Sequence, residues 1–210
     1  MMMDFTNLRI NEERLWQSLM DMAKIGATPK GGVCRLALTE LDGVSRDLFV
    51  SWCKDAGMDI HIDKVGNIFA RRPGKDASRP PIATGSHLDT QPTGGRFDGV
   101  YGVLAGLEVV RSLNDADFET DAPIEVVVWT NEEGSRFPPA MMGSGVHAGI
   151  FPLNDVLTKK DGDGISFQSA LSTIGYDGPV DVGTHSFGAY IEAHIEQGPI
   201  LEAEQVPVGI

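Results

Sequence analysis

The sequence predicts an α/β protein with a central mixed, mostly parallel sheet flanked by helices. Three observations predict it: β-branched runs typical of buried strands, apolar residues at helical spacing between those runs, and glycine-rich turns that join the two. The clearest strand is IEVVVWT at 124–130. Alternating strands and helices favour a sheet with helices on both faces. The chain has 210 residues, enough to bury a core and to form one full α/β domain or two small ones.

The first helix is predicted to begin after Asn11, a good N-cap that is followed by two acidic residues. Leu15, Leu19 and Met22 share one face of this helix, and a glycine and a proline end it. A second helix is expected from about Ser45 to Ala56, with apolar residues four apart and a glycine just past its end.

From there on, the sequence alternates between strand and helix patterns. We expect strands at 58–63, 66–71, 81–84, 124–130, 189–194 and 206–210. We expect helices at 99–113, 142–149, 153–159 and 167–174. Glycine- and proline-rich loops connect these segments, as is common around enzyme sites.

The composition excludes several classes of function. Lys plus Arg is 17 and Asp plus Glu is 30, which gives a net charge of −13 and argues against nucleic acid or an anionic membrane as partner. The longest apolar run, 126–129, is far too short to cross a bilayer. The start of the chain carries no visible secretory signal. With only two cysteines and no disulfide framework, a cytoplasmic location is expected.

Three polar clusters follow three of the predicted strands. They are GSHLDT with GGRFDG (85–90 and 94–99), TNEEGSRF (130–137) and EAHIEQGP (192–199). In open α/β sheets ligands bind at the carboxyl edge of the strands, so these clusters can converge in space. This placement predicts a functional site at that edge.

The first and third clusters offer metal-ligand chemistry. His87 and Asp89 project to the same side of an extended backbone, and Asp89 is placed to accept the second N–H of a metal-bound imidazole. Asp98 lies just before a predicted helix, and its two oxygens can bridge two cations. His194 would supply an imidazole from the third strand end. Imidazole and carboxylate ligands suit zinc, manganese or cobalt.

The second cluster contains adjacent acids, Glu132 and Glu133, which cannot easily share one role. One of them can bind metal while the other acts as general base and later gives the proton to a leaving nitrogen. The remaining histidines, His61, His147 and His185, have no ligand spacing and are expected to be ordinary half-exposed residues. The two cysteines, 34 and 53, are expected to be small buried hydrophobes.

Three longer motifs carry a family resemblance. GSHLDTQPTGGRFDGVYGVLAGLEV, WTNEEGSRFPPAMMGS and HIEQGPILEAE together resemble the hydantoinase/carbamoylase family of metal-dependent amidohydrolases, within the aminoacylase-like metallopeptidase clan (the M20 family). The resemblance covers about residue 10 to Ile210. The histidine in HIEQGP separates this family from the true peptidases of the clan. The second motif is more similar to N-carbamoyl-L-amino acid hydrolases and β-ureidopropionases than to allantoate amidohydrolases.

The resemblance implies a role for each matching residue. The metal ligands would be His87 and His194 on one ion, Glu133 on a second, and Asp98 as the bridge. The catalytic residues would be Glu132 as general acid/base and Asp89, which orients His87. Gln197 would contact the substrate. The cofactor would be two divalent ions, zinc first and manganese or cobalt as alternatives, and the reaction would be hydrolysis of an N-carbamoyl amino acid to amino acid, carbon dioxide and ammonia.

The resemblance also implies an incomplete catalytic domain over 1–210, cut before a lid domain. Family members are about twice as long, form homodimers through that lid, and obtain a last histidine ligand from beyond it. The family pattern has five protein ligands, of which this chain offers four, so we expect weak binding of the second metal and little turnover by these residues alone. Three alternatives remain open: an allantoate amidohydrolase, a dipeptidase or aminoacylase of the same clan, and a non-catalytic fragment that acts by association with another chain.

Overall fold

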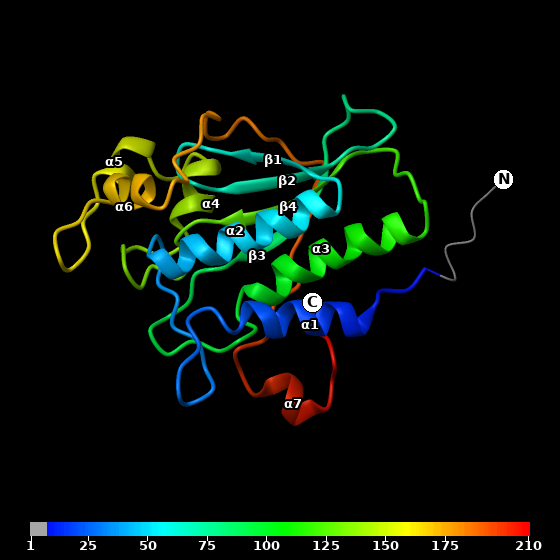
Figure 1. Cartoon of the computed structure of the whole chain (residues 1–210), viewed down its shortest axis with the longest axis horizontal. Coiled ribbons are helices and arrows are strands. Elements are labelled where there is room, and N and C mark those ends of the chain that lie inside the picture. The colour runs from blue at the N-terminus through cyan, green and yellow to red at the C-terminus, as the bar shows by residue number, and fades with distance from the viewer. Residues whose placement is uncertain (1–7) are drawn as a thin grey trace.

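The computed structural model describes residues 8–210 and has the predicted α/β architecture, with a mixed sheet in the order β1-β2-β4-β3-β5 (Figure 1). The strands are β1 (Asp59–Ile62), β2 (Ile68–Arg72), β3 (Ile82–His87), β4 (Ile124–Trp129) and β5 (Ala189–Ile191). β3 pairs in parallel with both β4 and β5, whereas β2 is antiparallel to β1 and β4. The carboxyl ends of β3, β4 and β5 therefore lie at one edge of the sheet.

The three longest helices pack on the sheet, either directly or through another helix. α3 (Val100–Asp115) packs on β3 and β4, α2 (Glu40–Asp55) packs on β1, and α1 (Glu12–Met22) packs on α3 (Figure 1). Four shorter helices follow: α4 (Met142–His147), α5 (Leu153–Leu157), α6 (Phe167–Thr173) and α7 (Ile200–Glu204). α4 contacts β4, and α5 packs against both α4 and α6.

Successive side chains along each central strand point to opposite faces of the sheet, as expected from the two-residue period of a β-strand, and they join two different apolar clusters. Ile68 and Val126 belong to the large core that also includes the apolar faces of α1, α2 and α3. Phe69, Val127 and Trp129 point to the other face, where a smaller cluster packs with Phe187. The sheet is thus apolar on both faces at its centre, which leaves its carboxyl edge for polar side chains.

α1 forms as predicted and is held by an ion pair to α3. The Asn11 side chain accepts a hydrogen bond from the backbone N–H of Arg14 and caps the helix. The Arg14 guanidinium donates to both oxygens of Glu108, at 2.7 and 2.8 Å, and Glu108 is 1% exposed. The hydroxyl of Ser112 and the backbone N–H of Asn11 also donate to Glu108. One buried carboxylate therefore joins the start of α1 to the middle of α3.

α2 begins at Glu40, five residues before the predicted start at Ser45. The Thr39 side chain accepts from the backbone N–H of Asp42 and caps the helix there. The first turn then contains Gly43, whose low helix propensity hid the true start from a prediction based on apolar spacing. An added Cβ at Gly43 would lie 3.3 Å from Ile174, so the small residue also allows close packing.

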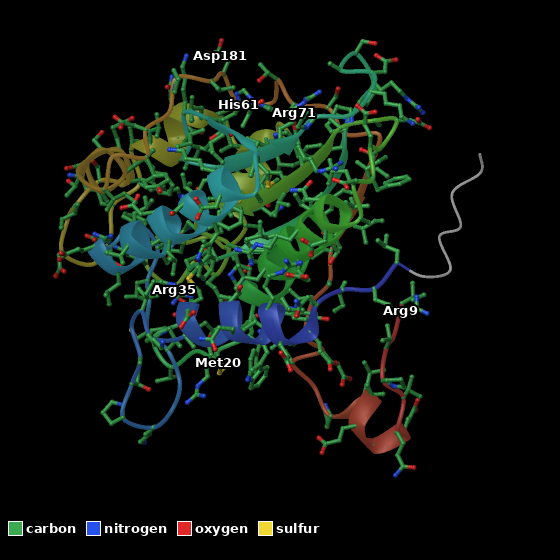
Figure 2. All side chains as sticks on the ribbon, turned by 45° about the vertical axis from the view of Figure 1, so that its right-hand side comes forward. Arg9, Met20, Arg35, His61, Arg71 and Asp181 are labelled. Atoms are coloured by element: carbon green, nitrogen blue, oxygen red, sulfur yellow. The ribbon has the colours of Figure 1, made fainter. Side chains whose placement is uncertain are left out.

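The predicted strand at 206–210 is wrong. These residues form no regular secondary structure, and Val206, Val208 and Ile210 are exposed. A strand needs a neighbouring strand for its backbone N–H and C=O groups, and residues 206–210 make no strand pairing within the described part of the chain. The residues just before this segment form the short helix α7, and the first two N–H groups of α7 donate to the carboxylate of Glu196. Figures 1 and 2 both show α7 standing away from the rest of the molecule.

Part of the expectation about a secretory signal depends on residues 1–7, which lie outside the described residues. Among residues 8–210, none of the helices combines the length and the apolar character that a bilayer span requires. Both cysteines are free: Cys53 is buried as expected, whereas Cys34 is partly exposed.

The contact between Arg14 and Glu108 gives a stability prediction. Burial alone would raise the pKa of Glu108, but the hydrogen bonds from Arg14 and from the Asn11 backbone outweigh it, so this pKa lies below its ordinary value of 4.5. The stabilisation is therefore present above pH 4.5 and is lost as the pH falls through the lower pKa of the folded protein. We expect Glu108→Gln to lower the free energy of unfolding at neutral pH by about 1–3 kcal/mol in urea denaturation.

The difference between Glu108→Gln and the wild-type chain should shrink as the solution is acidified below the ordinary pKa. Glu119→Gln, at an exposed position just beyond the end of the same helix, is the matched control and should leave the unfolding midpoint unchanged. Equal midpoints for Glu108→Gln and the wild type would contradict a stabilising role for this ion pair.

Candidate metal centre

The edge where β3, β4 and β5 end carries all three polar clusters. His87 is the last residue of β3 and is 2% exposed. Asp98 follows the Gly-Gly turn and lies two residues before α3, and it is 6% exposed. His194 comes three residues after β5 and is more open, with 31% of its side chain exposed. The parallel pairing thus places side chains from distant parts of the sequence side by side.

Three of these side chains form a compact set of metal donors. One ligand atom from each of His87, Asp98 and His194 lies within 4.8 Å of the other two. The Asp98 Oδ1 atom is 3.4 Å from His194 Nε2 and 3.9 Å from His87 Nε2. This Oδ1 atom is buried and has no hydrogen-bond donor among the described residues. A buried carboxylate oxygen without a donor, facing two imidazole nitrogens, fits a divalent cation.

The backbone beside His87 is shaped so that the imidazole can reach this position. Gly99, between Asp98 and α3, has a φ of +66°, which side-chain-bearing residues rarely adopt. A Cβ atom built on Gly99 would lie 2.4 Å from His87 Nε2. Glycine is therefore required here both by its conformation and by the space that the His87 ring fills.

Hydrogen bonds orient both imidazoles with Nε2 towards Asp98. His87 Nδ1 is 2.8 Å from the backbone oxygen of Asp89, and His194 Nδ1 is 2.8 Å from that of Ile195. A carbonyl oxygen can only accept, so each Nδ1 carries a proton, and the neutral form of each ring then has its lone pair on Nε2. This is the tautomer that a metal ligand needs.

Asp89 acts on His87 differently from the sequence-based expectation. Its backbone oxygen contacts His87 Nδ1, whereas its carboxylate Oδ1 is 4.0 Å away. The carboxylate instead accepts the backbone N–H groups of Glu132 and Glu133, each at 3.2 Å. Complete burial raises the pKa of Asp89. Asp89 therefore joins the loop after β3 to the loop after β4.

The buried Arg35 also holds the loop after β3 in place. Its Nε atom donates to the backbone oxygen of Leu88 at 2.8 Å, and its Nη1 atom donates to that of Ile25 at 2.7 Å. The backbone of Arg35 exchanges hydrogen bonds with Thr90 as well. His87 and Asp89 are thus fixed by contacts on both sides, which sequence motifs alone did not indicate.

Glu132 lies against the donor set, and its Oε2 atom is 3.4 Å from His87 Nε2. Burial raises the pKa of Glu132, and the nearby charges of Glu133 and Glu192 act in the same direction, while His87 opposes them. A carboxyl group with a raised pKa that is still partly open to solvent is suited to accept and return a proton.

Two predicted site residues take positions beside this donor set. Glu133 is not part of the group formed by His87, Asp98 and His194: its Oε2 atom accepts from Gln91 at 3.0 Å, and its Oε1 atom is buried with no hydrogen-bond donor among residues 8–210. The Gln197 amide donates to Asp98 Oδ2. The arrangement thus supplies one complete set of three donors and a further carboxylate nearby.

The histidines without ligand spacing gather elsewhere. His185 stacks on Phe69 at a ring-centroid distance of 4.1 Å, His147 stacks on Phe187 at 5.3 Å, and His61 lies 5.9 Å from His185. They belong to the aromatic side of the sheet opposite α3 and contribute no donor to the three-residue group. His61 lies in β1, His147 ends α4, and His185 precedes β5. Their common location therefore depends on the tertiary fold and could not be seen in their spacing.

Comparisons with known proteins find a matching family model and similar proteins. Residues 83–210 match the family model described as peptidase family M20/M25/M40. The chain is 54% identical to an N-carbamoyl-L-amino-acid amidohydrolase of Rhizobium meliloti, over 97% of this chain and 49% of that protein. It is 33% identical to a ureidoglycolate hydrolase of Arabidopsis thaliana, over 98% of this chain and 45% of that protein.

A solved structure is similar as well. A hydantoinase/carbamoylase family amidase from Burkholderia vietnamiensis superimposes with a TM-score of 0.94 at 60% identity, over 97% of this chain and 49% of that one. The chain spans about half the length of the curated relatives that it matches.

The position of Gly99 gives a prediction about metal binding. Gly99→Ala should displace the His87 ring and reduce the affinity for Zn²⁺ or Co²⁺ by about 10–100-fold, the range typical for loss of support to a ligand. Isothermal titration calorimetry measures the affinity, and circular dichroism checks that the variant is folded. Gly95→Ala is the matched control, because an added Cβ at Gly95 meets no atom within 4 Å. Unchanged affinity in a folded Gly99→Ala protein would contradict His87 as a ligand.

Proposed function

The chain belongs to peptidase family M20/M25/M40 and to its hydantoinase/carbamoylase amidohydrolases. On this premise we propose that it provides catalytic residues for metal-dependent hydrolysis of N-carbamoyl (ureido) amino acids. The observation that carries the proposal is the group of His87, Asp98 and His194 with the carboxylate of Glu132 beside it. A set of imidazole and carboxylate donors next to a proton-transferring acid is an arrangement suited to metal-dependent hydrolysis of an amide.

In this proposal His87, His194 and Asp98 would hold one divalent ion, and Asp98 and Glu133 would be the ligands of a second. A bound ion supplies Lewis-acid polarisation of the carbamoyl oxygen and lowers the pKa of a water molecule. We propose zinc, with manganese and cobalt as alternatives. The proton transfers are carried out by side chains of the protein.

Glu132 takes the proton from the attacking water and passes it to the leaving nitrogen as the C–N bond breaks. Its raised pKa makes the carboxylate a stronger base for taking up that proton. Asp89 keeps Glu132 in reach of the reacting atoms, because its carboxylate holds the backbone N–H of Glu132. Hydrolysis of the ureido group consumes water and yields the amino acid, carbon dioxide and ammonia.

The names of the relatives support a ureido substrate. N-carbamoyl-L-amino acids and ureidoglycolate both carry a terminal N–CO–NH₂ group, although the rest of each molecule differs. We propose an N-carbamoyl-L-amino acid as the substrate, with 3-ureidopropionate and allantoate as related candidates, and Gln197 as a substrate contact. The amide of Gln197 lies at Asp98, where a substrate would meet the proposed metal. We also propose that the protein is a homodimer located in the cytoplasm.

A chimera tests the proposed chemistry. Residues 1–210 are joined to the second half of the amidohydrolase from Rhizobium meliloti, and release of ammonia from N-carbamoyl-L-amino acids is measured with added Zn²⁺, Mn²⁺ or Co²⁺. We expect turnover, and we expect Glu132→Gln to reduce kcat by about 10²–10⁴-fold, the usual contribution of general acid–base catalysis. Glu119→Gln is the control and should retain the activity of the unmodified chimera. Full activity of Glu132→Gln would contradict the role of Glu132.

Residues 1–210 without a second half should bind one ion tightly and a second weakly. The three-donor group is complete, whereas Glu133 lies outside it. We therefore expect one equivalent of Zn²⁺ in calorimetry and no more than trace hydrolysis of 3-ureidopropionate. Asp98→Asn should abolish the tight equivalent, and Glu119→Gln should preserve it. Two tight equivalents, or turnover comparable with that of a full-length amidohydrolase, would show that these residues are sufficient by themselves.

A further inference from the structure

Glu192 uses both carboxylate oxygens to join the three strands that end at the candidate metal centre. Its Oε1 atom accepts from the hydroxyl of Ser86, in β3, at 2.5 Å. Its Oε2 atom accepts from the hydroxyl of Tyr190, in β5, at 2.9 Å. Tyr190 in turn accepts from the indole Nε1 of Trp129, in β4, at 2.9 Å. Hydrogen bonds to a carboxylate are among the stronger ones in proteins, so this chain of contacts fixes the relative positions of the strand ends.

Each member of this hydrogen-bonded chain is close in sequence to a residue of the site. Ser86 directly precedes His87, and Glu192 comes two residues before His194. Trp129 ends β4, from which the chain continues to Glu132. A change in the Glu192 contacts would therefore act on residues from all three clusters.

His194 needs this support more than His87 does. The parallel pairing of β3 with β5 covers only Ile82–Thr84 with Ala189–Ile191, so it ends three residues before His194. All three residues of β5 are exposed. Beyond the end of the pairing, the Glu192 side chain connects the segment to β3 through its hydrogen bond with Ser86.

The α3 helix supports the same segment from a second direction. A Cβ atom built on Gly102 would lie 2.5 Å from the backbone oxygen of Ala193 and 2.9 Å from Ser86 Cβ. The backbone between Glu192 and His194 is therefore seated directly on the first turns of α3, at a place where only glycine fits. This contact independently places the segment at the same position as the Glu192 hydrogen bonds do.

We propose that Glu192 is a positioning residue that holds His194 at the distance from His87 and Asp98 that a shared divalent ion needs. It acts through His194 and is outside the three-donor group itself. The inference rests on the proposed metal centre, but it concerns a residue to which neither the motifs nor the relatives gave a role.

Zn²⁺ affinity and the visible absorption spectrum of the Co²⁺ complex test this inference on residues 1–210. We expect Glu192→Ala to weaken Zn²⁺ binding about tenfold or more and to change the Co²⁺ spectrum, because a displaced His194 alters the coordination. Glu192→Gln retains one acceptor oxygen and should recover part of the affinity. The thermal midpoint of the metal-free protein should stay close to that of the wild type, because the segment that carries Glu192 is exposed.

Two further variants keep the test decisive. Tyr190→Phe removes the hydrogen bond to Glu192 Oε2, and with it the link to Trp129, with little change in volume. We expect a smaller loss of affinity than for Glu192→Ala, because the contact of Glu192 with Ser86 remains. Glu202→Ala, at an exposed position of α7, is the matched control and should bind Zn²⁺ like the wild type. Wild-type affinity and spectrum in Glu192→Ala would overturn the positioning role while leaving the metal centre intact. Failure of the wild-type chain to bind Zn²⁺ would overturn the metal centre and this inference with it.

Discussion

The parallel pairing of β3 with β4 and β5 is the constraint on which the candidate site depends. Parallel strands end at the same edge of a sheet, so His87, Glu132 and His194 come together although more than a hundred residues separate the first from the last. The pairing itself requires a strand core that can be buried on both faces, and the β-branched β4 provides it. The polar residues then need only to follow the strands directly, as they do in this chain.

The same edge concentrates charge that the protein does not neutralise by itself. Asp98 and Glu132 both lie within 4 Å of His87 Nε2, and Glu133 follows Glu132 directly, in a chain that already carries a net charge of −13. Burial and mutual repulsion raise the pKa of Glu132, and a buried oxygen of Asp98 faces two imidazole nitrogens with no hydrogen-bond donor among the described residues. Buried acidic groups are normally paired or coordinated to metal. A divalent cation would remove this electrostatic cost, and its loss would leave the site less stable than the surrounding sheet.

Much of the fold, and the convergence of His87, Asp98 and His194 at one edge of the sheet, could be predicted from the sequence because both depend on local patterns. The capped helix at Asn11, the strand at 124–130 and the donors that follow the strands each have a signal within a few residues. The start of α2 after Thr39 was missed because Gly43 weakens the helical pattern there. The strand expected at 206–210 was wrong because strands depend on partners that sequence does not reveal. The contacts of Asp89 with the Glu132 loop, and of Glu192 with β3 and β5, join residues far apart in the chain and emerge only from the three-dimensional structure.

A crystal structure of the chain grown with Zn²⁺, with anomalous diffraction measured at the zinc edge, tests the proposed metal centre most directly. We predict an anomalous peak bound by His87 Nε2, His194 Nε2 and Asp98 Oδ1, at about 2.0–2.2 Å from each. Zinc bound at other residues, or imidazoles of His87 and His194 that turn away from a common point while the strands remain paired, would contradict it.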